Sequence, residues 1–185
     1  MQAKIILVGG GARSGKSHFA MAYARRLGER RLFLATAQPF DAEMRERIAR
    51  HREERGAAFI TVEEPLRLTR ALSEAEDVDV VLVDCLTLWL SNLLLQGLGT
   101  ADIERELEEF VAAIKLRRHS TVLVSNEVGM GVVPESHLGR VFRDLAGATH
   151  KRLVADADEV YLAAMGLVVR LLPAPVIALR PGELA

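Results

Sequence analysis

The chain has 185 residues, half of them hydrophobic, and a formal net charge of -1 at pH 7. This length suffices for one domain with a full core and does not require a second, so we expect a single domain over residues 1–185. The balanced charge and a pI near 6.5 give no global basic field, so nucleic acid is not indicated as a partner.

Cysteine content and hydropathy narrow the class of protein further. The single cysteine, Cys85, excludes an intramolecular disulfide and a cysteine-rich zinc site. The N-terminus leads into an apolar run with no signal-peptide pattern, so we expect a cytoplasmic protein. The apolar stretch 85–95 is interrupted by polar residues and is shorter than the roughly 20 residues that cross a bilayer, so no membrane span is expected.

A glycine-rich segment directly follows the apolar run 5–8, which predicts a buried strand. The segment matches the P-loop pattern of Gly, four residues and Gly-Lys-Ser/Thr. Its members are Gly10, Gly11, Ala12, Arg13, Ser14, Gly15, Lys16 and Ser17. The backbone N–H groups would hold phosphates, Lys16 would contact the β- and γ-phosphates, and Ser17 would bind Mg²⁺. The helix expected over 16–27 would direct its positive N-terminus at the same oxygens.

A second strand is expected over 31–36, and its carboxyl end leads into a loop at the edge where open α/β sheets bind ligands. Asp41 is a suitable N-cap for a helix over 42–55. Met44 and Ile48 are the only sizeable apolar residues of this helix, and its second half is rich in arginine. We therefore expect a helix that few apolar contacts hold in place and that can move or bind an anion.

The next strand is expected over 59–62, followed by a helix that opens at 63–65 and runs to about residue 75. The apolar run 79–83 then ends in Asp84. Such a run has the form of a Walker B strand, in which the carboxylate would hold Mg²⁺ beside Ser17. An aspartate that caps the next helix is the alternative, and the upstream P-loop favours the metal interpretation.

The remaining elements continue the alternation of helices and strands. We expect helices over 86–96, 101–118 and 136–155, strands over 120–125, 159–164 and 167–172, a long loop over 126–134, and an irregular tail over 173–185. This order predicts right-handed crossovers and a mostly parallel sheet covered on both faces. The fold class is therefore α/β, a P-loop NTPase-type three-layer sandwich.

A P-loop alone does not separate GTPases, motor ATPases and small-molecule kinases. The chain has no Asn-Lys-x-Asp motif for reading guanine. Asp84 does not begin an Asp-x-x-Gly motif, because Thr87 stands at the position of the glycine. A signalling GTPase is therefore disfavoured. Cys85 stands where a motor ATPase usually has a glutamate that activates water. Nucleotide hydrolysis is therefore not the favoured outcome.

His51 is the candidate nucleophile, because it lies among the arginines of the helix 42–55. Those positive charges disfavour a protonated ring and could hold a triphosphate against it. From composition alone, a solvated surface histidine is the favoured interpretation. No functional role is expected for the other histidines, the cysteine and the tryptophan. We expect surface positions for His18, His119, His137 and His150, and core positions for Cys85 and Trp89.

Asn126 and Glu127 open the loop 126–134, which contains two glycines. Such a loop at the carboxyl edge of the sheet is a candidate substrate loop. The two side chains could equally brace the loop or contact a substrate.

Four motifs together go beyond a generic P-loop. They are the glycine-rich segment 10–17, Ala35-Thr36-Ala37, the pattern Asp41-x-Glu43-Met44-x-x-Arg47-Ile48-x-x-His51, and Asn126-Glu127-Val128-Gly129-Met130-Gly131-Val132-Val133-Pro134. In this combination the chain resembles the bifunctional adenosylcobinamide kinase/adenosylcobinamide-phosphate guanylyltransferase family of cobalamin biosynthesis, from Ile5 to about Leu172.

The resemblance implies a transferase with two reactions. ATP or GTP phosphorylates the corrinoid adenosylcobinamide, and GTP then guanylylates a histidine, matched here by His51, before GMP passes to adenosylcobinamide phosphate. Catalytic roles fall on His51 and Lys16. The implied nucleotide contacts, besides the P-loop, are Ala35, Thr36, Ala37, Arg52, Glu53, Glu54, Arg55, Glu63 and Asp84, with Mg²⁺ held by Ser17 and Asp84. The resemblance also implies a homotrimer.

Two other functions stay open at this stage. A P-loop kinase for another small alcohol would phosphorylate its substrate without taking up a guanylyl group. A nucleotide-gated binding protein would bind GTP and catalyse neither reaction. The helix 42–55 is expected to move, so His51 could lie far from the P-loop in a single conformation.

Overall fold

The structure, a computed structural model, describes residues 2–179 apart from the side chains of Arg47, Glu54 and residues 177–179. The described residues form one sheet with the strand order β3-β2-β4-β5-β1-β6-β7-β8. The strands are β1 (Ile5–Gly10), β2 (Arg31–Ala35), β3 (Ile60–Glu63), β4 (Val80–Asp84), β5 (Ser120–Asn126), β6 (Glu159–Ala164), β7 (Leu167–Leu172) and β8 (Ile177–Leu179). The helices are α1 (Lys16–Leu27), α2 (Ala42–Arg55), α3 (Leu68–Ser73), α4 (Leu86–Leu95), α5 (Thr100–Lys115) and α6 (His137–Val154), with a short 3₁₀ helix η1 (Gly56–Ala58).

Strands β3, β2, β4, β5, β1 and β6 are parallel to one another, whereas β7 runs antiparallel to β6 and β8 runs antiparallel to β7. Strand β1 lies between β5 and β6, with Gly10 level with Asn126 on one side and Ala163 on the other. The central strands are buried on both faces, as their continuous apolar runs require. Their carboxyl ends therefore meet at one edge, where the P-loop begins.

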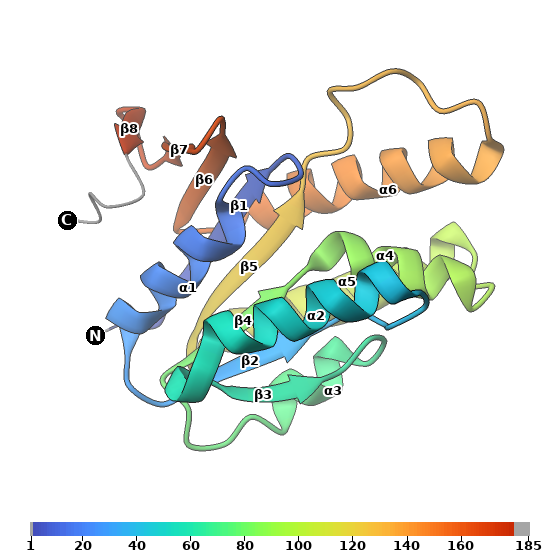
Figure 1. Ribbon diagram of the computed structural model, residues 1–185. Coiled ribbons are helices and arrows are strands. Elements are labelled where there is room, and N and C mark those ends of the chain that lie inside the picture. Colours follow the sequence, from blue (N-terminus) through green and yellow to red (C-terminus); the bar gives the residue numbers. More distant parts are fainter. Residues whose placement is uncertain (1, 180–185) are drawn as a thin grey trace.

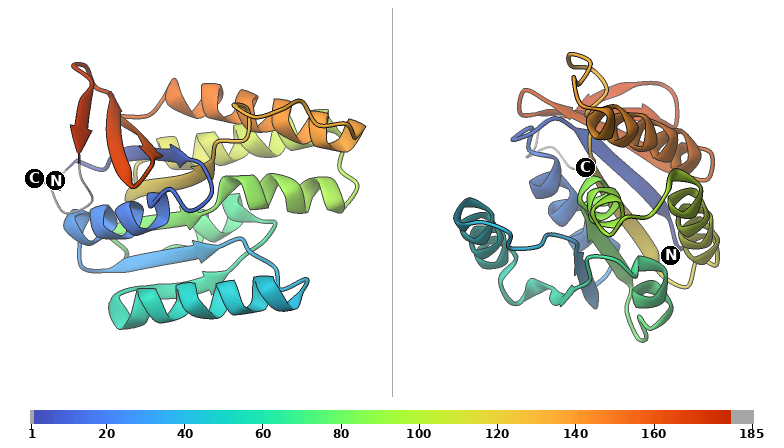
Figure 2. Two further views of the ribbon diagram at one scale, coloured as in Figure 1. Left: turned by 45° about the horizontal axis from the view of Figure 1, so that its top comes forward. Right: turned by 90° about the vertical axis from the view of Figure 1, so that its right-hand side faces the viewer.

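Helices cover both faces of the sheet (Figures 1 and 2), and alternate residues of the central strands belong to different cores. On one face, Ile6 and Val8 pack with Phe19 of α1. On the other, Ile5 and Leu7 belong to a larger core with α3, α4, α5 and α6, in which Trp89 and Phe110 are fully buried. The predicted three-layer α/β fold with a mostly parallel sheet is confirmed.

Two boundaries differ from the predictions. Glu63 is the last residue of β3, and α3 begins only at Leu68, because the carboxylate of Glu64 accepts hydrogen bonds from the N–H groups of Leu66 (3.0 Å) and Arg67 (2.8 Å) and so holds a turn. The tail predicted to be irregular over 173–185 contains the short strand β8, which pairs with β7. Residues 180–185 of that segment lie outside the described part of the chain.

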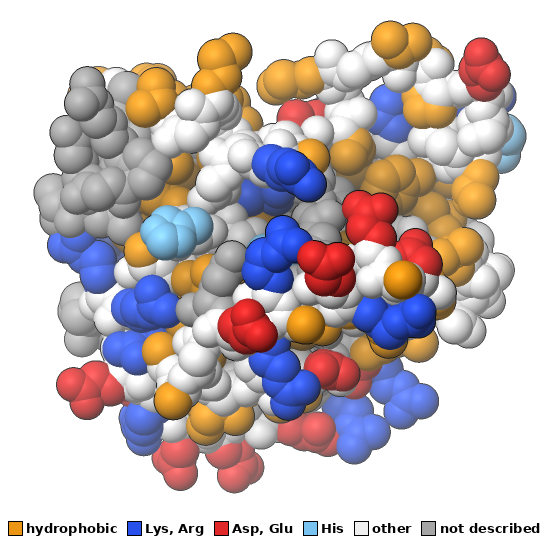
Figure 3. Space-filling view, in the orientation of Figure 1, with side chains coloured by type: hydrophobic (Ala, Val, Ile, Leu, Met, Phe, Trp, Pro, Cys, Tyr) orange, Lys and Arg blue, Asp and Glu red, His pale blue; other side chains and the backbone are white. Residues whose placement is uncertain are grey.

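Helix α2 stands apart from the compact body in front of β2 and β3 (Figure 2). Asp41 caps it by accepting a hydrogen bond from the N–H of Met44 at 2.7 Å, as predicted. Charged side chains of both signs cover the region where α2 lies (Figure 3). No helix in residues 2–179 is long and apolar enough to cross a membrane.

Candidate active site

The P-loop joins the carboxyl end of β1 to the start of α1. Gly10 and Gly15 have φ angles of 152° and 93°, conformations that favour glycine. The ammonium group of Lys16 donates to the carbonyl of Gly11 at 3.1 Å. Ser14 Oγ is buried and, within the described residues, has no hydrogen-bond partner. A buried hydroxyl without a partner in this loop fits a site for a phosphate oxygen.

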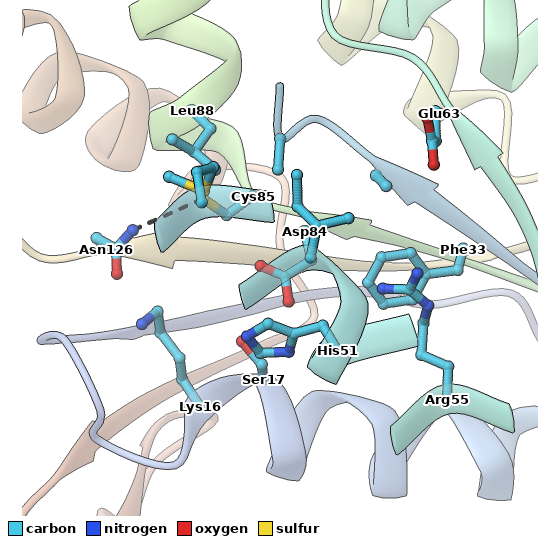
Figure 4. A pocket seen from close by; sticks show the side chains of 14 residues that line it. Lys16, Ser17, Phe33, His51, Arg55, Glu63, Asp84, Cys85, Leu88 and Asn126 are labelled. Carbon is cyan, nitrogen blue, oxygen red and sulfur yellow. Dashed lines mark hydrogen bonds between the residues drawn. The ribbon is translucent and has the colours of Figure 1, made fainter. Parts of the chain in front are cut away.

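A pocket opens beside the P-loop, between the sheet edge and α2 (Figure 4). It is lined by Lys16, Ser17, Phe33, Ala35, Ala37, Met44, Ile48, His51, Arg55, Glu63, Asp84, Cys85, Leu88 and Asn126. Its walls therefore combine apolar side chains from β2, α2 and α4 with polar groups near the P-loop. Such a mixture suits a ligand with an apolar ring and an anionic end.

A second pocket lies over the P-loop itself. It is lined by Ala12, Arg13, Ser14, Gly15, Lys16, Ser17, His18, Glu43, Glu46, Arg50 and His51. Lys16, Ser17 and His51 line both pockets. The histidine of α2 thus lies next to the P-loop, and the expectation that it could lie far away does not describe this conformation.

Ser17 and Asp84 both line the first pocket, and Asp84 directs its carboxylate toward Ser17 and His51 (Figure 4). A hydroxyl and a carboxylate are oxygen ligands of the kind that Mg²⁺ prefers, and nucleotide phosphates usually supply the others. Among residues 2–179 no cluster of three or more His, Cys, Asp or Glu could hold a metal ion alone. The residues present therefore fit a magnesium ion that arrives with a nucleotide.

Arg55 and Phe33 form one side wall of the first pocket. The guanidinium carbon of Arg55 lies 4.1 Å from the centre of the Phe33 ring, and Phe59 packs edge-on against the same ring. Both Arg55 and Phe33 are buried. This cation–π contact attaches the C-terminal end of α2 to the sheet. Glu63 lies at the opposite rim and is exposed (Figure 4).

Three other predicted contacts lie elsewhere. Thr36 is fully buried. Its hydroxyl accepts a hydrogen bond from the N–H of Cys85 and donates one to the carbonyl of Cys85, both at 2.8 Å. This side chain therefore stabilises the backbone beside the pocket and does not line it. Arg52 and Glu53 are exposed on α2 and line neither pocket. The side chain of Glu54 is outside the described residues.

Asn126 lines the first pocket, whereas Glu127 turns away to brace its own loop. The carboxylate of Glu127 accepts a hydrogen bond from Gly129 N at 2.6 Å and lies 3.6 Å from His150 Nδ1. His150 Nε2 in turn hydrogen-bonds Ser125 Oγ at 2.7 Å. Glu127 therefore braces the loop, whereas Asn126 stays a candidate for contact with a substrate.

The prediction that all four remaining histidines are surface residues was wrong for two of them. His119 is buried and His150 is largely buried, and this burial lowers the pKa of both, for His150 against the opposing effect of the Glu127 carboxylate. Cys85 is buried as predicted, and burial with the nearby charge of Asp84 raises the pKa of its thiol to about 11. A reactive thiolate is therefore not part of the site.

Sequence reasoning missed the apolar wall of the first pocket, which Phe33, Met44, Ile48 and Leu88 form. The spacing of Met44 and Ile48, four residues apart on α2, was the one sequence feature that could have indicated this wall. Nothing in the sequence distinguished Phe33 from the other core residues of β2.

The family model of cobinamide kinase / cobinamide phosphate guanyltransferase matches residues 6–171. The bifunctional adenosylcobalamin biosynthesis protein CobP of Pseudomonas aeruginosa is 44% identical over 87% of this chain and 93% of its own. The proteins named CobU of Escherichia coli K12 and Salmonella typhimurium LT2 are each 40% identical over 90% of this chain and 99% of their own.

Among solved structures, the chain is similar to the flagellar accessory protein FlaH of Methanocaldococcus jannaschii (TM-score 0.55, 12% identity, 96% of this chain and 84% of the other). It is also similar to the RadB recombinase (TM-score 0.53, 14% identity, 96% and 86%). At these identities the structures support the P-loop α/β fold alone. The family match and the close relatives together show that the chain belongs to the cobinamide kinase/cobinamide phosphate guanyltransferase family.

Proposed function

We propose that the chain phosphorylates adenosylcobinamide with ATP or GTP, and then guanylylates the product through a histidine intermediate at His51. The observation that carries this proposal is the position of His51, which lines both pockets together with Lys16 and Ser17. A phosphate chain held by the P-loop would therefore lie within reach of the imidazole. A histidine in this position suits a covalent transfer better than simple nucleotide binding.

In the guanylyl reaction, a ring nitrogen of His51 forms a bond to the α-phosphorus of GTP. The bond from that phosphorus to the bridging oxygen breaks, and pyrophosphate leaves with the electron pair. A phosphate oxygen of adenosylcobinamide phosphate then attacks the same phosphorus and displaces the histidine. The products are adenosylcobinamide-GDP and the free enzyme, so one transfer between two anions becomes two steps.

The walls of the first pocket suit a guanine base. Arg55 on Phe33 offers a flat surface, and Ala35 and Ala37 leave room beside it. The carboxylate of Glu63 at the rim could accept hydrogen bonds from guanine N1–H and the N2 amine. An adenine has no such pair of donors on that edge, so we assign guanine preference in the second reaction to Glu63.

Phosphate binding belongs to the P-loop. Lys16 and the backbone of residues 10–17 neutralise and orient the phosphates, and the orphaned Ser14 hydroxyl supplies one more donor. We assign Mg²⁺ to Ser17 and Asp84. When bound, the ion would neutralise charge on the phosphate oxygens.

The remaining parts of the proposal concern assembly and location. A homotrimer is what the family resemblance implies, and exposed apolar side chains such as Val132 on the loop before α6 and Met165 between β6 and β7 are available for contacts between copies. We further propose that residues 1–185 act as one domain, and that the enzyme works in the cytoplasm, where its nucleotide substrates are found. Sedimentation of the purified chain tests the trimer.

The test of the function is product analysis. Purified protein is incubated with adenosylcobinamide, Mg²⁺ and ATP, and then with GTP, and the corrinoids are identified by mass spectrometry. We expect adenosylcobinamide phosphate first and adenosylcobinamide-GDP after GTP is added. Phosphorylation without the second product would instead support a kinase alone, and nucleotide binding without either product would refute both activities.

A further inference from the structure

A buried polar network lies behind the first pocket, at the carboxyl ends of β4 and β5. Asn126 Nδ2 donates to Thr87 Oγ1 at 2.8 Å, and Asn126 N donates to the same oxygen at 3.3 Å. Thr87 Oγ1 lies 3.2 Å from Cys85 Sγ, and Asn126 Nδ2 lies 3.6 Å from that sulfur. Thr87 and Cys85 are both buried, whereas Asn126 reaches the pocket.

The network fixes which way the Asn126 amide points. A hydroxyl oxygen has two acceptor lone pairs, and both of those on Thr87 are used by Asn126, so its hydrogen is directed at Cys85 Sγ. Turning the amide by 180° would remove both contacts of Nδ2, to Thr87 Oγ1 and to Cys85 Sγ, and would turn the NH₂ group toward the pocket that Lys16 lines. The amide nitrogen therefore stays on the protein side.

The amide oxygen of Asn126 consequently faces the pocket, and Figure 4 shows it pointing away from the contact between the amide nitrogen and Cys85. Within the described part of the chain no donor reaches this oxygen. It shares the pocket with Lys16 and Asp84, on the side where the phosphates of a bound nucleotide would end. An acceptor in this position, next to a phosphate site, can receive a hydrogen bond from a bound ligand.

We propose that Asn126 is a catalytic residue of the kinase reaction, whose Oδ1 accepts a hydrogen bond from the acceptor hydroxyl and aligns its oxygen with the γ-phosphate. Thr87 is the positioning residue that holds the amide in this orientation. The inference rests on the proposed function and concerns its kinase reaction alone. It assigns to the end of the pocket beside Lys16 and Asp84 the binding of a group that donates a hydrogen bond.

In this step the hydroxyl oxygen forms a bond to the γ-phosphorus, the bond to the bridging oxygen breaks, and the nucleoside diphosphate leaves with the electron pair. The hydroxyl proton is lost to solvent as the new bond forms, because an amide is no base. Phosphoryl transfer depends mainly on alignment and charge neutralisation, so an aligned hydroxyl suffices. Guanylylation of His51 uses no hydroxyl and should not need Asn126.

The experiment compares Asn126→Ala with wild type in two assays on the same preparations. The kinase assay measures transfer from γ-labelled ATP to adenosylcobinamide, and the guanylyl assay measures uptake of α-label from GTP in the absence of corrinoid. We expect the kinase kcat/KM to fall about 100-fold, the effect of misplacing a reactant. Guanylyl uptake should stay within about threefold and also reports that the protein is folded.

Two substitutions of Thr87 form a matched pair of variants, one without the hydroxyl and one with it. Thr87→Val removes the hydroxyl while keeping the shape, and we expect about a tenfold lower kinase kcat with the KM for ATP unchanged; Thr87→Ser should restore activity. Thr87→Val should add little to Asn126→Ala, because both remove one function.

A wild-type chain that phosphorylates no corrinoid refutes the proposed function itself. Wild-type kinase activity that survives unchanged in Asn126→Ala overturns this inference alone. Equal losses in both assays also overturn it, because they would show a structural role.

Discussion

A side chain at Gly10 should destabilise the fold, whereas one at its neighbour Gly11 should not. A Cβ at Gly10 would overlap the backbone oxygen of Ala163, and would lie 2.8 Å from Ser14 Oγ. Strand β1 cannot shift away, because it is hydrogen-bonded to β5 and β6 on its two sides. The φ of 152° adds strain for any side chain.

The expected cost for Gly10→Ala combines about 1–3 kcal/mol of backbone strain with about 1–3 kcal/mol of overpacking. The reduced entropy of the unfolded chain offsets about 0.4–1 kcal/mol of this. A net loss of about 1–6 kcal/mol corresponds to a fall in Tm of about 2–24 °C for a chain of this size. At Gly11 no atom lies within 4 Å of an added Cβ, so Gly11→Ala should change Tm by no more than about 2 °C.

The assay is thermal unfolding of the three proteins without nucleotide, followed by far-UV circular dichroism. A Gly10→Ala variant as stable as wild type would refute the packing argument. Equal losses in both variants would refute the distinction between the two glycines.

Two further predictions concern buried groups. Trp89 donates to the carbonyl of Leu66 at 2.8 Å, so Trp89→Phe should cost about 1–3 kcal/mol in urea unfolding, and no change would show that water replaces the bond. Burial lowers the pKa of His119 and His150 below the ordinary 6.5, so the unfolded chain binds more protons and stability should fall as pH drops below about 6.5. Each histidine contributes at most about 1.4 kcal/mol per pH unit, His150→Gln should reduce the slope, and a flat profile between pH 7.5 and 5.5 would contradict the assignment.

Much of the fold follows from local sequence patterns. Continuous apolar runs predict the central parallel strands, and the P-loop pattern places the first turn and helix. The start of α3 was missed because Pro65 is typical of a first helical turn, while the turn held by Glu64 delays it. Strand β8 was missed because its pairing depends on β7 and not on its own proline-rich surroundings.

The candidate site, like the fold, is only partly predictable from local sequence patterns. Lys16, Ser17 and Asp84 meet because the carboxyl ends of parallel strands share one edge, which is a rule of topology. The placement of His51 over the P-loop depends on how α2 docks, and the Arg55 contact with Phe33 that contributes to it is tertiary. Burial of His119 and His150 is likewise a tertiary property that composition does not reveal.

The claim that His51 carries the guanylyl group is tested most directly by labelling. Purified protein is incubated with Mg²⁺ and GTP labelled at the α-phosphate, beside His51→Ala and His18→Ala, the second histidine that lines the pocket over the P-loop. We predict label that is acid-labile and base-stable, present in wild type and His18→Ala and absent in His51→Ala. Wild-type protein that binds GTP without taking up label, or label that persists in His51→Ala, would contradict the account.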